Sequence, residues 1–120
     1  MTCAKRLARQ KDAEILVLDR RNHHLFQPLL YQVAMAGLSP ADIATPIRSV
    51  FRKRPNVRVL MAEVISVDPL VKSVQTTAGK FEFDYLVLAC GSEHSYFGHE
   101  NWEDFAPGLK TVEQATEIRR

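Results

Sequence analysis

Ile15-Leu16-Val17-Leu18-Asp19 is a continuous apolar run that ends in an acid. Such a run predicts a strand that is buried on both faces of a parallel sheet, and we expect that strand over Ala13–Asp19. A helix with a basic side is expected directly before it, over residues 2–11. A helix followed by a buried strand is the second half of a βαβ unit, so the chain predicts an α/β fold.

Asp19 stands where the second strand of a dinucleotide-binding domain places a carboxylate that binds ribose hydroxyls. On position alone, a solvated or helix-capping acid is an equally good interpretation. A glycine-rich turn is expected about 20 residues before such an acid, and only 18 residues precede Asp19. We therefore expect the first strand and the turn that seats a pyrophosphate to be missing from these 120 residues.

A second apolar run, Tyr85–Cys90, leads directly into Gly91 and predicts another buried parallel strand. A glycine at that point lets a ligand approach the backbone at the carboxyl edge of the sheet, where open α/β sheets bind ligands. The strand ends at Asp19 and Gly91 together indicate one ligand site.

Short helices are expected after the first strand. The segment Leu29–Met35 predicts one that Gly37 ends. Ser39-Pro40 and Thr45-Pro46 each combine a hydroxyl cap with a proline at the first helical position, and so predict two further helix starts. The second of these helices would carry an apolar face.

Strand signals follow. Val57–Met61 predicts a strand, and three further short strands between residues 63 and 83 predict a β-meander with turns at Asp68-Pro69 and Ala78-Gly79. An aromatic-rich loop is expected over Ser92–Leu109. Thr111 with Gln114 three residues later is a capping box, which predicts a last helix reaching Arg120.

The composition is that of a globular protein, with 46% hydrophobic and 25% charged residues. There is no apolar run of the ~18 residues that a membrane span needs, and no signal peptide is visible. Residues 1–60 carry eleven basic and four acidic side chains (+7), whereas residues 61–120 carry five and ten (−5). Solvated helix faces explain the basic half best. Binding to anionic lipid or nucleic acid stays an alternative, although no aromatic residues interleave as a nucleic-acid groove requires.

No catalytic or metal-binding pattern stands out. There is no Gly-x-Ser-x-Gly elbow for a nucleophilic serine, and Cys3 and Cys90 form no Cys-x-x-Cys pair, so both are expected as free thiols. The four histidines lack partners at metal-ligand spacing. We therefore predict no metal site and no catalytic dyad or triad.

Several strings closely resemble the type II NADH:quinone oxidoreductases, in unbroken order over almost the whole chain. They are Asp19–Ala34, Gly37–Ala44, Pro46–Arg48, Tyr85–Gly91, His94–His99 and Pro107–Thr111. The resemblance implies a monotopic flavoprotein of the respiratory chain that binds FAD in the first of two dinucleotide domains and NADH in the second. Electrons would pass from NADH through FAD to quinone at the membrane.

By position, the resemblance implies an FAD site. Asp19 would take the adenosine ribose, flanked by Arg20. The flavin ring would lie near Gln27, Pro28, Leu29 and Leu30, the adenine near the backbone of Glu63 and Val64, and the pyrophosphate and ribityl chain near Ala89, Cys90 and Gly91. Lys110 lies in the segment that returns toward the flavin and receives no role.

The expected fold is thus one partial Rossmann-like FAD-binding domain over residues 1–120, without its first strand and glycine-rich turn and with a β-meander insertion. The NADH domain and the membrane anchor would lie outside it. We expect the 120 residues alone to be inactive as an NADH:quinone oxidoreductase. For the whole protein, the resemblance implies a cytoplasmic location at the inner face of the membrane and a possible homodimer. A non-enzymatic remnant, a mis-started reading frame and a basic-surface binding module remain alternatives.

Overall fold

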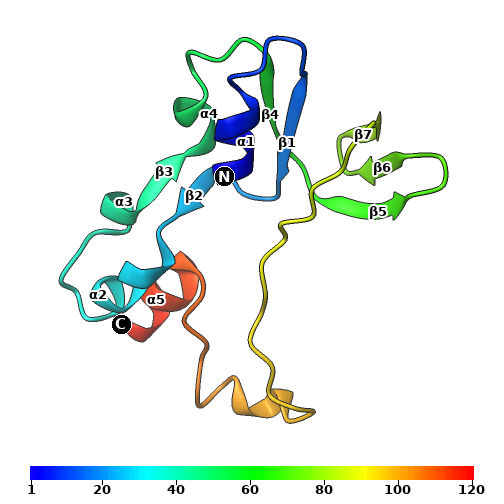
Figure 1. Cartoon of the computed structure of the whole chain (residues 1–120). Coiled ribbons are helices and arrows are strands. Elements are labelled where there is room, and N and C mark those ends of the chain that lie inside the picture. Colours follow the sequence, from blue (N-terminus) through cyan, green and yellow to red (C-terminus); the bar gives the residue numbers. More distant parts are fainter. The chain divides into compact units, whose positions relative to one another are not determined.

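The computed structural model describes residues 1–120 and divides them into two compact units. The first unit contains Met1–His24 and Pro46–Leu88, and the second contains Leu25–Thr45 and Ala89–Arg120. Both mix helices with short strands or turns (Figure 1). The boundaries between the units fall within β2 (His23–Leu25), within β3 (Ala44–Pro46), and between Leu88 and Ala89. β2 and β3 form a two-stranded sheet.

A parallel strand pair organises the first unit. β1 (Ile15–Asp19) pairs with β4 (Val57–Met61) along the full length of both strands. This confirms the strand expected at the apolar run. All five residues of β1 are only partly buried, however. The expectation of a strand covered on both faces is therefore wrong, because helices from this unit cover one face only.

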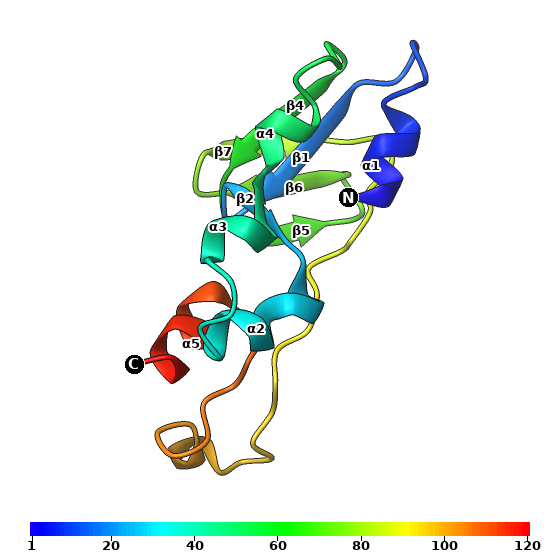
Figure 2. The same cartoon turned by 90° about the vertical axis from the view of Figure 1, so that its left-hand side faces the viewer.

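Two helices, α1 (Thr2–Leu7) and α4 (Ile47–Val50), lie beside the strand pair (Figure 2). Their core consists of Ala8, Ile47 and Phe51, packed against alternate residues of both strands. Alternate residues point to the same face of a strand, which is why valines two apart on β4 reach the same core. α1 ends at Leu7, well before residue 11, and Leu7 is 41% exposed.

The start of α4 differs from its expectation. Thr45 does not cap it; Pro46 is the N-cap residue, and no side chain caps the helix. The backbone N–H of Ile47 instead donates to the carbonyl oxygen of Asn22 at 2.9 Å. β3 extends to Pro46, so the helix begins one residue later than expected and the cap position falls on Pro46, whose side chain has no hydroxyl to accept a hydrogen bond.

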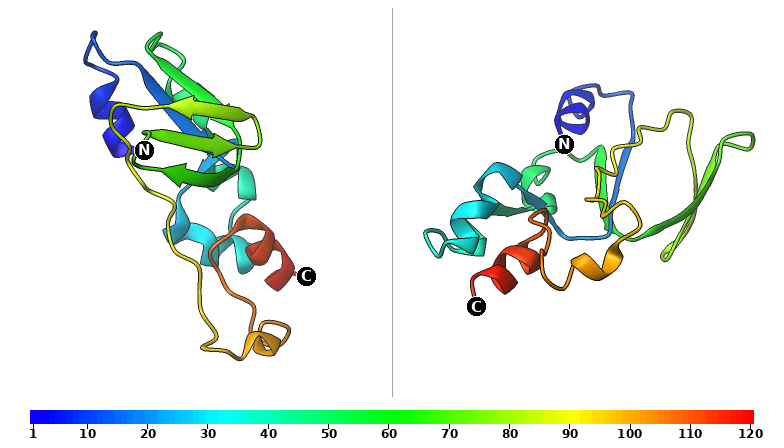
Figure 3. Two further views of the ribbon diagram at one scale, coloured as in Figure 1. Left: turned by 90° about the vertical axis from the view of Figure 1, so that its right-hand side faces the viewer. Right: turned by 90° about the horizontal axis from the view of Figure 1, so that it is seen from below.

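The expected β-meander is present. β5 (Val64–Asp68), β6 (Ser73–Thr76) and β7 (Gly79–Glu82) form an antiparallel sheet (Figure 3). Asp68 builds the first turn, since its Oδ1 accepts from the backbone N–H groups of Leu70 and Val71 at 3.0 and 3.2 Å. Gly79 provides the second turn with φ 121°, a backbone conformation that favours glycine.

The second unit is built from short helices. They are η1 (Gln27–Leu29), α2 (Leu30–Ala34), α3 (Pro40–Ile43), η2 (Glu100–Trp102) and α5 (Val112–Ile118). α2 packs against α5, around a core of Leu30, Val33, Ile43 and Ala115 (Figure 1).

Capping boxes at Ser39 and Thr111 start α3 and α5 as expected. The last helix ends at Ile118 rather than at the final residue. At the end of α2 the left-handed residue is Ala36, with φ 60°, and not Gly37. The N–H of Gly37 instead donates to the carbonyl oxygen of Gln32 at 2.7 Å and closes the helix.

Tyr85–Cys90 is not a strand, and this expectation is wrong. The segment has no regular structure, and the exposed fractions of Tyr85, Val87 and Leu88 are 94%, 61% and 70%. An apolar strand is stable only when its backbone groups pair and its side chains are covered. β1 and β4 pair only with each other, so neither provides that partner.

Candidate functional site

The carboxyl ends of β1 and β4 meet at Asp19. Asp19 lies opposite Met61 in the parallel register, and its carbonyl oxygen accepts from the backbone N–H of Ala62 at 2.9 Å. Its side-chain Oδ1 accepts from the backbone N–H of Arg21 at 2.8 Å. The turn after β1 thus holds the carboxylate at the sheet edge, beside the segment that begins at Glu63.

The backbone of Glu63 is held by a residue that the sequence did not single out. Its N–H donates to Oγ1 of Thr77 at 3.1 Å, and its carbonyl oxygen accepts from the N–H of Thr77 at 3.0 Å. A carbonyl oxygen has a second lone pair, so one acceptor remains for a ligand. Val64 starts β5 and pairs with Thr76. Glu63 and Thr77 lie 14 positions apart, and no local sequence pattern predicted their contact.

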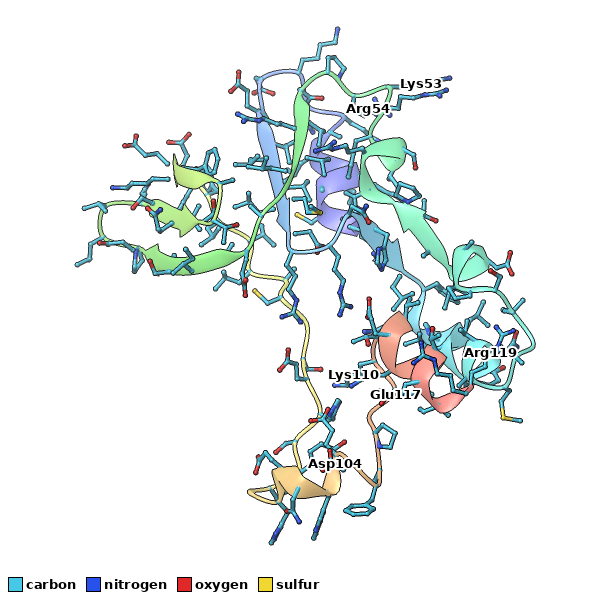
Figure 4. All side chains as sticks on the ribbon, turned by 180° about the vertical axis from the view of Figure 1, so that it is seen from behind. Lys53, Arg54, Asp104, Lys110, Glu117 and Arg119 are labelled. Carbon is cyan, nitrogen blue, oxygen red and sulfur yellow. The ribbon has the colours of Figure 1, made fainter.

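In the second unit, Lys110 joins three segments. Its Nζ donates to the carbonyl oxygen and Oγ of Ser92 at 3.1 and 3.0 Å, and its backbone N–H donates to Oε1 of Gln114 at 2.9 Å. Its carbonyl oxygen accepts from Nε2 of Gln27 at 3.4 Å. Figure 4 labels Lys110, which directly precedes Thr111, the N-cap residue of α5. Lys110 therefore connects η1, the residues that follow Gly91, and the cap of α5.

The residues expected near a flavin ring differ in exposure. Gln27 and Pro28 are exposed, Leu29 is half-buried against the core of the second unit, and Leu30 is 1% exposed within that core. Leu30 is thus a packing residue. Because η1 begins with Gln27-Pro28, the proline occupies a position where its missing N–H leaves no carbonyl unpaired.

Ala89, Cys90 and Gly91 are exposed and lie in a segment without regular structure. Gly91 has φ 79°, so its backbone conformation favours glycine. Cys90 and Cys3 are free thiols, as expected. The backbone at Gly91 leads directly to Ser92 and its contact with Lys110.

The aromatic loop holds itself together. Oη of Tyr96 donates to the carbonyl oxygen of Ala106 at 2.6 Å, and the rings of His99 and Trp102 stack with their centroids 4.4 Å apart. His94 lies edge-on to Tyr96, and its Nε2 is 3.5 Å from a carboxylate oxygen of Glu103. Desolvation raises the pKa of Tyr96 above its ordinary value of 10.0, and the Glu103 carboxylate adds to this rise, while a backbone hydrogen bond with Gly108 opposes it.

The expected site residues therefore form one group in each unit. Asp19, Arg20, Glu63 and Val64 lie at the edge of the β1–β4 pair. Gln27 and the segment Ala89–Gly91 belong to the second unit, where Lys110 contacts Gln27 and the residue after Gly91. The described residues contain no group of three or more side chains that could hold a metal ion. No helix in the structure has the length and apolar character needed to cross a membrane.

Comparison with known proteins decides the family. The family model described as pyridine nucleotide-disulphide oxidoreductase matches residues 1–120. The chain belongs to the pyridine nucleotide-disulphide oxidoreductase family.

Curated relatives in this family carry the name that the sequence resemblance indicated. The chain is 41% identical over 123 residues to the type II NADH:quinone oxidoreductase Ndh of Mycobacterium tuberculosis, covering 99% of this chain and 26% of that protein. It is 31% identical over 109 residues to the type II NADH:quinone oxidoreductase of Staphylococcus saprophyticus, covering 91% and 27%. The chain thus spans about a quarter of the length of these relatives.

Solved structures share the fold of this chain. The sulfide:quinone oxidoreductase of Aquifex aeolicus superposes with a TM-score of 0.86 at 29% identity, covering 98% of this chain and 27% of that one. NDH2 of Plasmodium falciparum in complex with NADH superposes with a TM-score of 0.79 at 23% identity, covering 88% and 23%. These matches confirm the Rossmann-like fold class.

Proposed function

We propose that these 120 residues form part of the FAD-binding domain of a flavoprotein that passes electrons from NADH to quinone. The proposal rests on the family, on relatives named for that activity, and above all on the placement of Asp19. FAD, when bound, supplies the chemistry that accepts a hydride from NADH and delivers electrons to quinone. The protein's own residues bind and orient it.

The position of Asp19 carries the proposal. A carboxylate at the carboxyl end of a parallel strand, next to the backbone of the neighbouring strand's end, suits a ribose diol beside an adenine ring. The carbonyl oxygen of Asp19 accepts from the backbone N–H of Ala62, and its carboxylate accepts from the backbone N–H of Arg21. Asp19 therefore lies at such an edge. Glu63 and Val64 would then lie on the adenine side, with Arg20 flanking the ribose.

The remaining residues that the resemblance assigns to FAD belong to the second unit. We propose that Gln27, Pro28 and Leu29 lie toward the flavin ring and that Ala89, Cys90 and Gly91 line the pyrophosphate and ribityl chain. The exposed backbone at Gly91, with no Cβ, suits close approach of a ligand. The 120 residues contain no Gly-x-Gly-x-x-Gly turn, so within them the adenosine ribose is the best-fitted part of FAD.

Flavin binding tests the proposal. We expect the purified 120-residue protein to quench FAD fluorescence on titration, and Asp19→Asn to weaken that binding by about tenfold, because a neutral amide accepts weaker hydrogen bonds from hydroxyls. Asp68→Asn is the matched control, since Asp68 builds a similar turn in the same unit but on the meander. A protein that stays colourless and binds no FAD would favour the non-enzymatic alternative.

The same proposal covers the whole protein. We propose NADH and quinone as its substrates, and peripheral association with the inner face of the membrane and a possible homodimer as its setting. A polypeptide of these 120 residues spans about a quarter of its relatives, and we propose that by itself it does not oxidise NADH. Turnover of NADH with a soluble quinone above a no-protein control would contradict this.

A further inference from the structure

A hollow of about 290 Å³ lies at the junction of α4 and β4, within the first unit. Both apolar side chains and guanidinium groups line it. The residues that line it are Arg48, Phe51, Arg52, Arg54, Pro55, Val57 and Val59.

The charged side chains around this hollow are all positive. Between Asp42 and Glu63 the sequence carries five basic residues and no acid. The three arginines that line the hollow are exposed, and none of them takes part in an ion pair or a side-chain hydrogen bond. Figure 4 shows the labelled Arg54 and Lys53 projecting away from the ribbon at this corner. Three unpaired guanidiniums around one hollow favour a carboxylate or phosphate, which they bind through two parallel hydrogen bonds.

The apolar side chains supply the second half of the recognition. Phe51 is 4% exposed, and Val57 and Val59 are half-buried against the same core. The parts of Val57 and Val59 that remain exposed would gain free energy when an apolar group covers them. The hollow also differs from the Asp19 edge, because Val57 begins β4 and Met61 ends it, roughly 13 Å apart along the strand.

We propose that this hollow binds an amphiphilic anion, with a phosphate or carboxylate head on Arg48, Arg52 and Arg54 and an apolar body over Phe51 and the valines. The ligand could come from a soluble alkyl phosphate or from an anionic phospholipid, which share this chemistry. The site is independent of the FAD proposal, because no residue of the hollow belongs to the expected cofactor site.

Calorimetric titration of the 120-residue protein with three soluble probes tests the chemistry. We expect hexyl phosphate to bind at least about tenfold more tightly than inorganic phosphate or hexanol, since only hexyl phosphate satisfies both the guanidinium groups and the apolar side chains. Equal affinity for hexyl phosphate and inorganic phosphate, or no binding of hexyl phosphate, overturns the proposal.

Charge-matched variants test whether the ligand binds at this hollow. Arg52→Gln and Lys53→Gln each remove one positive charge from the same turn, but only Arg52 lines the hollow. We expect Arg52→Gln to weaken hexyl phosphate binding by about tenfold and Lys53→Gln by less than about twofold. Circular dichroism of both variants checks that they fold. Equal losses would show diffuse charge attraction and overturn the proposal.

Vesicles identify the source of the anion. The protein is sedimented with phosphatidylglycerol vesicles, and phosphatidylcholine vesicles serve as the blank. If Arg52→Gln reduces the bound fraction and Lys53→Gln leaves it intact, the result supports a phospholipid ligand. Binding of hexyl phosphate without vesicle binding supports a soluble alkyl phosphate. Vesicle binding that both variants reduce equally contradicts a site at this hollow.

Discussion

Nζ of Lys110 donates to both the carbonyl oxygen and the hydroxyl of Ser92, although Lys110 and Ser92 lie 18 positions apart in the sequence. The same lysine accepts from Gln27 through its carbonyl oxygen. The side chain of Lys110 thus closes the aromatic loop at its base, and its backbone carbonyl oxygen connects the loop to η1. This relationship gives Lys110 a structural role that the sequence left unassigned.

Removing the Lys110 amine should loosen the base of the loop. We expect Lys110→Met to cost about 1 kcal/mol, because two charge-assisted bonds are lost at a partly exposed site. Amide hydrogen exchange near Ser92 should speed up, while exchange in β1 should stay unchanged. Lys72→Met, which removes one long bond to Asp84 in the other unit, is the control. Unchanged exchange near Ser92 would contradict the role.

The capping box at Thr111 should set the stability of α5. Oγ1 of Thr111 accepts from the N–H of Gln114 at 3.1 Å, and Oε1 of Gln114 accepts from the N–H of Thr111 at 3.2 Å. We expect Thr111→Ala to lower the free energy of unfolding by about 1 kcal/mol. Thr111→Ser keeps the hydroxyl and should cost much less. Chemical denaturation followed by circular dichroism measures both, and equal losses would rule out the cap as the cause.

Gly108 has no room for a side chain, since an added Cβ would overlap the imidazole of His94. We expect Gly108→Ala to destabilise the loop by about 1–3 kcal/mol, as overpacking usually does. The cost should fall sharply in a His94→Ala background, because the overlapping ring is then gone. A double-mutant cycle on unfolding free energies measures the difference. Additive effects would mean that the two residues do not touch in solution.

Phe51 should dominate the core of the first unit. Its side chain is 4% exposed, whereas Phe105 is 87% exposed. We expect Phe51→Ala to cost about 3–5 kcal/mol through lost burial and an unfilled cavity, which is enough to unfold a marginal protein. Phe105→Ala should change stability by less than about 0.5 kcal/mol. Thermal unfolding of the two variants gives the comparison, and similar midpoints would contradict the assigned core.

The raised pKa of Tyr96 predicts a loss of stability in alkali. Its hydroxyl donates to Ala106, and desolvation with Glu103 nearby disfavours the tyrosinate. Because the folded-state pKa lies above the unfolded value of about 10, this contribution is complete below about pH 10 and is lost as the pH rises through the folded-state pKa. Tyr96→Phe should flatten the alkaline slope. The difference in ultraviolet absorbance between the wild type and Tyr96→Phe should show Tyr96 ionising above its ordinary pKa of 10.0, and ionisation at or below that value would contradict the prediction.

Local chemistry explains why much of the fold could be predicted. The boxes at Ser39 and Thr111 and the turn at Asp68 each depend on hydrogen bonds between residues two or three apart. Such contacts form whenever the backbone takes the local conformation, so the sequence alone determines them. The apolar run that ends at Asp19 likewise predicted a strand. The position of Asp19 at the end of that strand indicated a ribose contact.

Tertiary structure decided the rest. Tyr85–Leu88 is as apolar as the run in β1, yet only β1 is a strand, because β4 supplies its hydrogen-bonding partner. Contacts such as Lys110 with Ser92, and Thr77 with Glu63, join residues that no local pattern relates. Strand formation and these contacts need groups from distant parts of the chain, so the sequence determined which segments could form strands or bind a ligand, and packing determined which of them do.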